Sequence, residues 1–187
     1  MDLKKMEEGI RMFLDGIGGG FEADDRERTP ERVARAWRDD LVSGYDLDPG
    51  EELTWTPCAA DEGLVLVRDV RFASICVHHL LPFFGTADVA YLPGRRLAGL
   101  SKIGRVLDAH SRRLQTQEHL TRGVVDTLVE VLEPRGVLVV LHAEHTCMSL
   151  RGVRKEGSRM TTMRGAGLLA EGARRDEALA LIAGHRG

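Results

Sequence analysis

GLVLVRDVRFASICVHHLLPFFGTADVAYLPG, residues 63–94, contains two strand-like runs joined by a short connection that carries two histidines. The first run, 63–76, is rich in valine and leucine. The second run, 85–94, alternates apolar residues on one face and ends in a Pro-Gly turn. We therefore expect these two runs to pair as a hairpin, with a cysteine and the histidines at its connecting end.

The order of helices and strands around this hairpin predicts an α+β fold. Before it, apolar spacing predicts a helix over 1–17, and Thr29 followed by Pro30 is typical of the start of a second helix, continuing to Leu41. Residues 43–62 are expected to form a loop. After the hairpin we expect, in order, helices over 101–113 and 116–133, a strand over 136–147 that continues extended to Val153, a strand over 160–163 and a short helix over 176–182.

This arrangement predicts an oligomer. A sheet with few strands leaves an edge exposed, and pairing of such edges between subunits into a larger barrel would cover them. We expect an N-terminal helical region over 1–50 and a single functional unit over 51–187.

Length and composition restrict the function classes. The chain has 187 residues, a formal net charge of -3 and a pI of about 6.2, so its bulk charge gives no indication of nucleic-acid binding. No apolar run approaches the roughly 18 residues of a membrane span, and the N-terminus lacks the apolar core of a secretory signal. Three cysteines do not make a disulfide framework, so we expect a reduced, cytoplasmic protein in which a Cys/His cluster serves metal binding or catalysis.

The cysteine and histidines of the hairpin connection have the spacing of a metal site. Cys76 is three residues before His79, and position alone does not choose between His78 and His79 as a ligand. A third ligand should come from a distant segment, and Cys147 supplies it, with His145 on the same face if both lie in a strand. A Cys₂His set leaves the fourth tetrahedral position to water, which is the pattern of catalytic zinc.

The other cysteine and histidines are expected to lie outside this site. A lone cysteine is usually a small buried hydrophobe, and we interpret Cys58 in that way. A lone histidine is more often a hydrogen-bonded or exposed residue than a ligand, which applies to His110, His119, His142 and His185.

A group of cations opens the predicted helix 101–113. Lys102 and Arg105 are neighbours on the helix surface, next to Ser101 and the backbone N–H groups that favour an anion. Arg151 follows Cys147 by four residues and could reach the same place. The alternatives are a binding site for a small polyanion and a solvated helix face.

Gln117 and Glu118 open the predicted helix 116–133. A glutamate in a first turn often only complements the helix dipole. A carboxylate can also accept two hydrogen bonds from an N–H and an amino group, which is the edge that guanine presents. The residues themselves leave both readings open.

The sequence resembles the GTP cyclohydrolase I family over about residues 28–165. The motifs that carry the resemblance, in family order and spacing, are TPERVARAW, CVHHLLPFFGTADVAYLPG, GLSKIGR, QTQEHLT and AEHTCMSLRGVRK. The resemblance implies a T-fold, in which an antiparallel sheet carries helices on one face and subunits form a shared β-barrel. It also implies a homodecamer of two pentamers with active sites at subunit interfaces.

The resemblance assigns a role to each matching residue. It implies Zn²⁺ bound by Cys76, His79 and Cys147, and proton transfer by His78 and His145. It implies that Gln117 and Glu118 recognise guanine. Contacts to the triphosphate are implied for Ser101, Lys102, Arg105, Arg151 and Arg32, with Arg32 reaching across an interface and Ser101 also assisting the sugar steps.

The implied reaction is hydrolysis of GTP at C8 with release of formate, followed by an Amadori-type rearrangement and ring closure to 7,8-dihydroneopterin triphosphate. Guanine C8 is a poor electrophile until N7 is protonated, and a histidine with a pKa of about 6.5 can supply and regain that proton. The triphosphate contacts would hold the base in position.

The sequence also departs from the family pattern. Val77 replaces a usually acidic residue, and loss of an orienting charge beside the ligands would lower metal affinity or rate. Two alternatives are a T-fold paralogue in specialised purine-derived biosynthesis and a non-catalytic oligomer that binds zinc and nucleotide. A zinc deaminase would need H-x-E together with P-C-x-x-C, a combination that this sequence lacks.

Overall fold

The computed structural model describes residues 1–20, 22–59 and 63–184. The chain divides into two compact units, Met1–Ser43 and Gly44–Gly187. The predicted functional division at residue 50 concerns activity and stays a prediction. None of the described helices is both long enough and apolar enough to cross a membrane.

The first unit consists of two helices packed on each other and a π-helical turn, η1 (Trp37–Leu41). Helix α1 (Leu3–Ile17) begins where the Asp2 side chain accepts a hydrogen bond from the Lys5 N–H at 3.1 Å. It ends at Gly18, whose φ of 85° is the left-handed conformation that glycine adopts without a steric penalty. The predicted helix over 1–17 is confirmed.

Helix α2 (Ala23–Ala36) begins earlier than predicted. The expected start at Thr29 and Pro30 is wrong, because Pro30 lies inside the helix. Acidic side chains in the first turn stabilise the earlier start through the helix dipole. One of them, Asp24, also pairs with Arg28 at 2.8 Å, one turn along.

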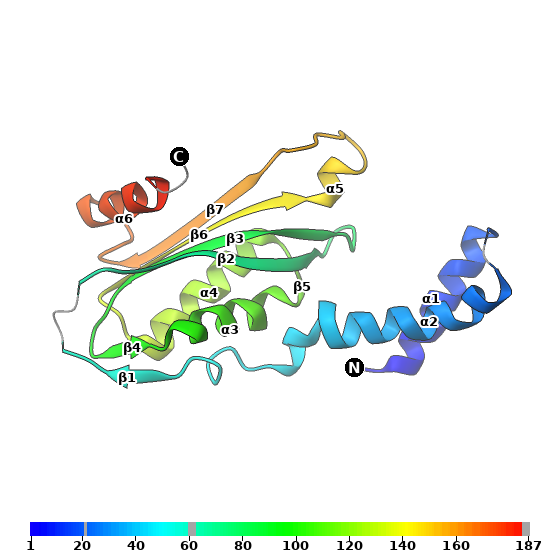
Figure 1. The fold of residues 1–187 in the computed structure, drawn as a ribbon, viewed down its shortest axis with the longest axis horizontal. Coiled ribbons are helices and arrows are strands. Elements are labelled where there is room, and N and C mark those ends of the chain that lie inside the picture. The colour runs from blue at the N-terminus through cyan, green and yellow to red at the C-terminus, as the bar shows by residue number, and fades with distance from the viewer. Residues whose placement is uncertain (21, 60–62, 185–187) are drawn as a thin grey trace. The chain divides into compact units, whose positions relative to one another are not determined.

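A five-stranded sheet forms the centre of the second unit (Figure 1), in the order β5-β2-β3-β6-β7. The strands are β2 (Val65–Cys76), β3 (Pro82–Leu92), β5 (Leu114–Gln115), β6 (Gly136–His145) and β7 (Met160–Gly167). All neighbouring pairs are antiparallel except β5 and β2. The predicted hairpin is therefore confirmed as β2 and β3, and β7 is longer than the predicted strand over 160–163.

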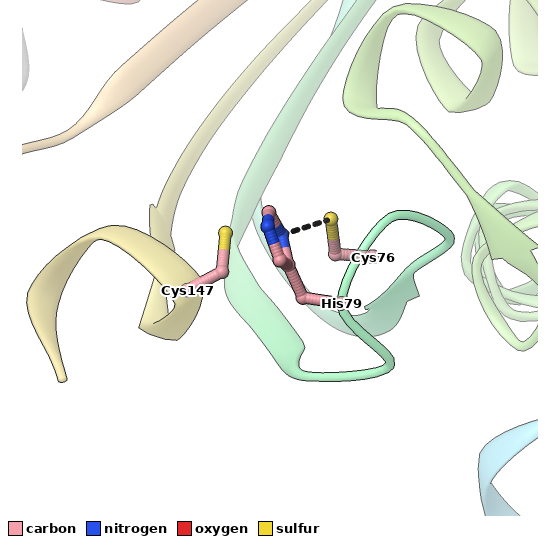
Figure 2. A group of neighbouring side chains, drawn as sticks. All are labelled: Cys76, His79 and Cys147. Atoms are coloured by element: carbon pink, nitrogen blue, oxygen red, sulfur yellow. Dashed lines mark hydrogen bonds between the residues drawn. The ribbon is translucent and has the colours of Figure 1, made fainter. Parts of the chain in front are cut away.

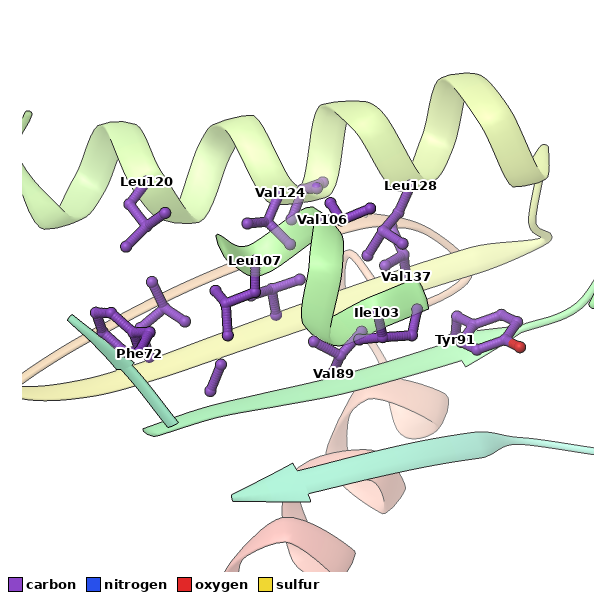
Figure 3. Close-up of a cluster of buried hydrophobic side chains, with 14 of the residues drawn as sticks. Phe72, Val89, Tyr91, Ile103, Val106, Leu107, Leu120, Val124, Leu128 and Val137 are labelled. Atoms are coloured by element: carbon purple, nitrogen blue, oxygen red, sulfur yellow. The ribbon is translucent and has the colours of Figure 1, made fainter. Parts of the chain in front are cut away.

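Helices α3 (Leu100–Ser111) and α4 (Gln117–Leu132) cover one face of this sheet and enclose the main core (Figures 1 and 3). Strand alternation points Val89 and Tyr91 of β3 towards these helices. The helices contribute buried side chains at helical spacing, among them Ile103, Val106, Leu107, Leu120, Val124 and Leu128. Both helices match the predicted ranges to within two residues.

Helix α6 (Ala173–Ala183) packs against the opposite face of the sheet (Figure 1). Its buried residues Ala178 and Ile182 share a cluster with Leu138 and Val140 of β6. The expectation of helices on one face holds for α3 and α4 and is wrong for α6. The result is a mixed α+β unit with an antiparallel-rich sheet, consistent with a T-fold.

Four short elements lie where a loop, or no element, was expected. They are η2 (Ser43–Asp46), β1 (Trp55–Pro57), β4 (Arg96–Ala98) and β5 (Leu114–Gln115). Strands β1 and β4 form a separate antiparallel pair, in which the Arg96 guanidinium lies 4.7 Å from the centre of the Trp55 ring. Three residues are too few to give a periodic signal, so pattern reading could not find these strands.

The chain after β6 turns into a short helix, α5 (Thr146–Ser149), and the predicted extended continuation to Val153 is wrong. Strand β6 ends at His145, and the next position would pair with Pro82, which has no N–H to extend the ladder. The Thr146 hydroxyl instead donates to the Pro82 carbonyl at 2.6 Å. Proline at the start of β3 therefore stops the strand.

Candidate active site

Cys76 is the last residue of β2 and lies at the mouth of the turn that leads to β3. The Leu80 N–H donates to the Cys76 carbonyl at 2.8 Å, and the Cys76 N–H donates to the Leu81 carbonyl at 2.9 Å. This tight turn places Cys76 Sγ 4.0 Å from His79 Nδ1 (Figure 2) and 3.9 Å from His78 Nδ1. Both histidines are exposed, so either ring is accessible to a ligand.

Cys147 reaches the same place from α5, as Figure 2 shows. One ligand atom from each of Cys76, His79 and Cys147 lies within 4.8 Å of the others. The predicted convergence of these residues is confirmed. The predicted reason was wrong, because Cys147 sits on a helical turn and not on the same strand face as His145.

The chemistry of these donors fits a zinc ion. Burial, with a further contribution from the Cys76 thiol, raises the pKa of the Cys147 thiol. Two sulfurs so close together repel each other as thiolates, and a cation between them would stabilise the deprotonated pair. Cys76 is buried while His79 is exposed, so the cluster opens to solvent on one side. A Cys₂His set with one open side leaves a coordination position free.

His145 lies at the end of β6, two residues before Cys147. Its ring stacks on Phe83, with ring centres 4.5 Å apart and planes 2° from parallel. His145 Nε2 is 2.9 Å from Gln117 Oε1. Burial lowers the pKa of His145, and the negative charge of Glu118 acts in the opposite direction. The ring is therefore held in a defined orientation near the cluster.

Gln117 is fully buried at the start of α4. Its amide contacts Thr162 and two backbone carbonyls as well as His145, so its side chain is engaged within the protein. The predicted contact with guanine stays a prediction. Sequence reasoning missed Phe83, Thr121 and Thr162 around it. Only Thr121 had a usable signal, since it follows Gln117 by one helical turn.

Glu118 is exposed beside Gln117 and lines a surface pocket. The pocket also contains side chains of α4 and β7, namely His119, Thr121, Arg122, Thr162, Met163 and Arg164. An exposed carboxylate in a hollow is available to a ligand, which agrees with the predicted role of Glu118 without testing it.

The predicted phosphate contacts belong to helix α3, to the segment after α5 and to helix α2. Ser101 and Arg105 are exposed in the first turns of α3, and Lys102 is half-buried there. Arg105 lies 3.7 Å from Glu52, with its side chain 60% exposed. Arg151 and Arg32 are also exposed, and Arg32 belongs to the other unit, where it pairs with Asp25 at 3.9 Å. In the part of the chain that the structure describes, no ion pair or hydrogen bond joins these residues to one another.

The histidines expected outside the site have other partners or positions. His110 Nε2 is 2.8 Å from Thr127 Oγ1, and His142 Nδ1 is 2.8 Å from Thr161 Oγ1. His119 is exposed on α4, and His185 lies outside the described residues. None of the described histidines other than His79 belongs to the three-ligand cluster.

The sheet, its helical layer and the Cys–His–Cys cluster define an α+β protein with a candidate three-ligand metal centre. The family model described as GTP cyclohydrolase I matches residues 6–183. The chain belongs to the GTP cyclohydrolase I family, and the resemblance seen in the motifs is confirmed.

Curated relatives match along nearly the whole chain. The GTP cyclohydrolase 1 of Carboxydothermus hydrogenoformans is 44% identical over 188 residues, covering 100% of this chain and 97% of the relative. That of Streptomyces avermitilis is 44% identical over 183 residues, covering 97% and 90%. Among solved structures, an apo archaeosine synthase QueF-Like aligns with a TM-score of 0.47 and 16% identity, covering 57% of this chain and 96% of the other.

Proposed function

We propose that this protein is a zinc-dependent GTP cyclohydrolase I that converts GTP to 7,8-dihydroneopterin triphosphate with release of formate. The proposal is carried by one observation, the approach of Cys76, His79 and Cys147 to within 4.8 Å from two distant segments. Membership of the family supports the same reading, as do relatives that bear the name GTP cyclohydrolase 1.

Cys76, His79 and Cys147 would hold the Zn²⁺. Bound zinc at such a site supplies a Lewis acid and a water molecule whose pKa falls towards about 7. Cys76 would hold the ion from the end of β2, and His79 would do so from the turn that follows. The exposed side of the cluster is where a substrate would approach.

His78 and His145 are the proposed proton carriers. Protonation of guanine N7 makes C8 a better electrophile, and a neighbouring imidazole can deliver that proton and take it back in a later step. His145 is held by Phe83 and Gln117, whereas His78 lies exposed on the turn beside Cys76. The two rings therefore differ in how firmly they are positioned.

Base and triphosphate would bind through different groups. Glu118 can accept from the ring N–H and the exocyclic amine of guanine, and its exposure in a pocket supports this role. Ser101, Lys102, Arg105 and Arg151 are the proposed triphosphate contacts in this unit, with Arg32 as a further contact. The start of α3 adds backbone N–H groups that favour an anion. These ionic contacts would hold C8 in place.

The assembly belongs to the same proposal. We propose a cytoplasmic homodecamer of two pentamers, in which strands at the sheet edges pair between subunits to form a barrel. Strand β7 lies at the edge of the sheet, so its outer backbone groups can accept another strand. Subunit association would also bring cations of neighbouring chains towards one site.

The decisive experiment is incubation of the purified, zinc-loaded protein with GTP. Formate and a fluorescent pterin should appear together, and metal analysis should find zinc in proportion to protein. Zinc without either product would reject the proposal and favour a non-catalytic oligomer. Product from another purine nucleotide but not from GTP would favour a specialised paralogue, for which Val77, 45% exposed beside Cys76, would be the first position to exchange.

A further inference from the structure

The amide orientation of Gln117 is determined by its buried surroundings. The amide nitrogen Nε2 lies 3.1 Å from the Leu141 carbonyl oxygen and 3.2 Å from the Met160 carbonyl oxygen. Carbonyl oxygens only accept hydrogen bonds, so the NH₂ group must face them. The reverse orientation would set the amide oxygen against two other oxygens in a fully buried position.

Two threonines reinforce this orientation through a closed ring of hydrogen bonds. The Thr121 hydroxyl donates to the Gln117 backbone carbonyl at 2.8 Å, which uses its only hydrogen. The Thr162 hydroxyl, 2.6 Å away, must therefore donate to Thr121 Oγ1. The lone pairs of Thr162 then accept from Gln117 Nε2 at 3.0 Å. Each hydroxyl hydrogen in the ring has one direction open to it, and the two amide hydrogens are shared among three acceptors.

The amide oxygen of Gln117 consequently faces His145 as an acceptor. Because Oε1 carries no hydrogen, His145 Nε2 at 2.9 Å must be the donor in this hydrogen bond. A neutral imidazole has one N–H, so the other nitrogen, Nδ1, then carries the lone pair. The stacked Phe83 ring keeps the imidazole in this plane.

We propose that Gln117 is a positioning residue that fixes His145 as its Nε2–H tautomer and leaves the lone pair on Nδ1. The effect of this orientation on turnover rests on the proposed function.

The test compares two glutamines whose side chains both donate several hydrogen bonds within the protein. Gln117→Met keeps the side-chain length and removes the acceptor for His145. Gln115→Met is the matched control, because Gln115 Nε2 donates to Ser74 and to backbone carbonyls but does not contact His145. We expect Gln117→Met to lower kcat for GTP by about 10- to 100-fold with little change in KM. Gln115→Met should leave both constants near those of the parent.

The direct readout is the nitrogen spectrum of His145. Magic-angle-spinning NMR of zinc-loaded, ¹⁵N-histidine-labelled protein should show a protonated Nε2 and an unprotonated Nδ1, assigned by loss of the signals in His145→Asn. In Gln117→Met the spectrum should become a mixture of tautomers, and in Gln115→Met it should not change.

An Nδ1–H tautomer in the parent, or an unchanged His145 spectrum in Gln117→Met, would overturn the inference. If Gln117→Met does not fold, the parent spectrum decides alone. Failure of the parent to release formate would reject the proposed function without touching the tautomer assignment, so the two failures are distinguishable.

Discussion

His110 and His145 occupy similar environments in two regions of the second unit. Burial lowers the pKa of both rings, to about 4 for His110. Both use Nε2 to contact a side chain of α4, Thr127 in one case and Gln117 in the other. They differ on the other side of the ring. His110 Nδ1 faces the backbone of Gly123 inside the helix pair, whereas His145 lies on Phe83 beside the Cys–His–Cys cluster.

This comparison separates a structural histidine from a candidate proton carrier. Burial and a lowered pKa are common to both rings, so neither property identifies the functional one. The distinguishing feature is the position of the ring, which lies inside the helix pair for His110 and beside the Cys–His–Cys cluster for His145. Changes in the His145 region should therefore affect metal and turnover, and changes in the His110 region should affect folding stability alone.

The largest effect is expected for Cys147→Ser. A serine hydroxyl is a poor zinc ligand at neutral pH, so the Cys₂His set becomes a two-ligand site and loses the metal. We expect zinc content and formate release to fall to background, while GTP binding survives because its contacts are on other residues. Metal analysis, a formate assay and equilibrium binding of GTP measure the three quantities.

Cys58→Ser is the matched control for this change. Cys58 lies outside the cluster, with Sγ 3.7 Å from the Gly94 carbonyl oxygen. The Cys58→Ser protein should retain both its zinc and its turnover of GTP. A Cys147→Ser protein with full zinc and full turnover would show that Cys147 is not a metal ligand.

The next effect concerns the base. Glu118→Gln removes the charge that would accept two hydrogen bonds from guanine, and such charged hydrogen bonds are worth about 1.5–3 kcal/mol. We expect the preference for GTP over ATP, measured as the ratio of binding constants, to fall about tenfold or more. Glu130→Gln, an exposed glutamate on the same helix, should leave the ratio unchanged. Equal ratios in Glu118→Gln and the parent would contradict the guanine assignment.

The metal cluster was predictable from sequence more readily than its supports. Cys76 and His79 are three residues apart, so local turn geometry already brings them together. Cys147 was predicted correctly for a wrong reason, because spacing in a presumed strand hid the helical turn that Pro82 imposes. Cys147 could be identified as the third ligand because several separated sequence motifs together matched the family.

The hydrogen-bond network around Gln117 had no comparable signal in the sequence. Thr162 meets Gln117 only because β7 pairs with β6 and α4 crosses the sheet, and these contacts depend on the tertiary fold. The hairpin, α3 and α4 were predictable because their apolar periodicity continues over many residues. The start of α2 was not, since its acidic first turn outweighs the usual preference of Pro30 for a helix start.

A smaller effect should distinguish the two histidine regions through stability. In Gly123→Ala the new methyl group would lie 2.7 Å from His110 Nδ1, and a planar ring cannot yield at its end as a flexible chain can. We expect the free energy of unfolding to fall by about 1–3 kcal/mol, measured by denaturant titration, with zinc content per folded chain unchanged.

Gly104→Ala provides the control in the partner helix. Its methyl group would have Val70 Cγ1 at 4.0 Å as its nearest neighbour, which is ordinary contact. Replacement of a helical glycine by alanine should then raise stability by about 0.5–1 kcal/mol. A destabilised Gly104→Ala together with an unaffected Gly123→Ala would show that His110 does not limit the packing of α3 on α4.

The last effect is the pH dependence that His110 adds to stability, which is spread over more than two pH units. Burial is the main cause of its lowered pKa, Arg113 lowers it further and Asp126 partly opposes them, so the folded value is about 4 against about 6.5 in the unfolded chain. Above pH 6.5 the ring is neutral in both states and contributes no pH dependence. As the pH falls from 6.5 towards 4, the unfolded chain binds a proton that the folded protein does not, so stability falls by up to about 1.4 kcal/mol per pH unit.

His110→Gln removes this proton uptake and should flatten the difference curve between pH 6.5 and 4. The variant is expected to be less stable than the parent at neutral pH, because the ring packs against α4 and contacts Thr127. The slope and not the absolute value is therefore the measurement, taken from denaturant titrations at a series of pH values. Parallel curves for variant and parent would mean that His110 is protonated in the folded protein, and the contrast with His145 would then have to rest on geometry alone.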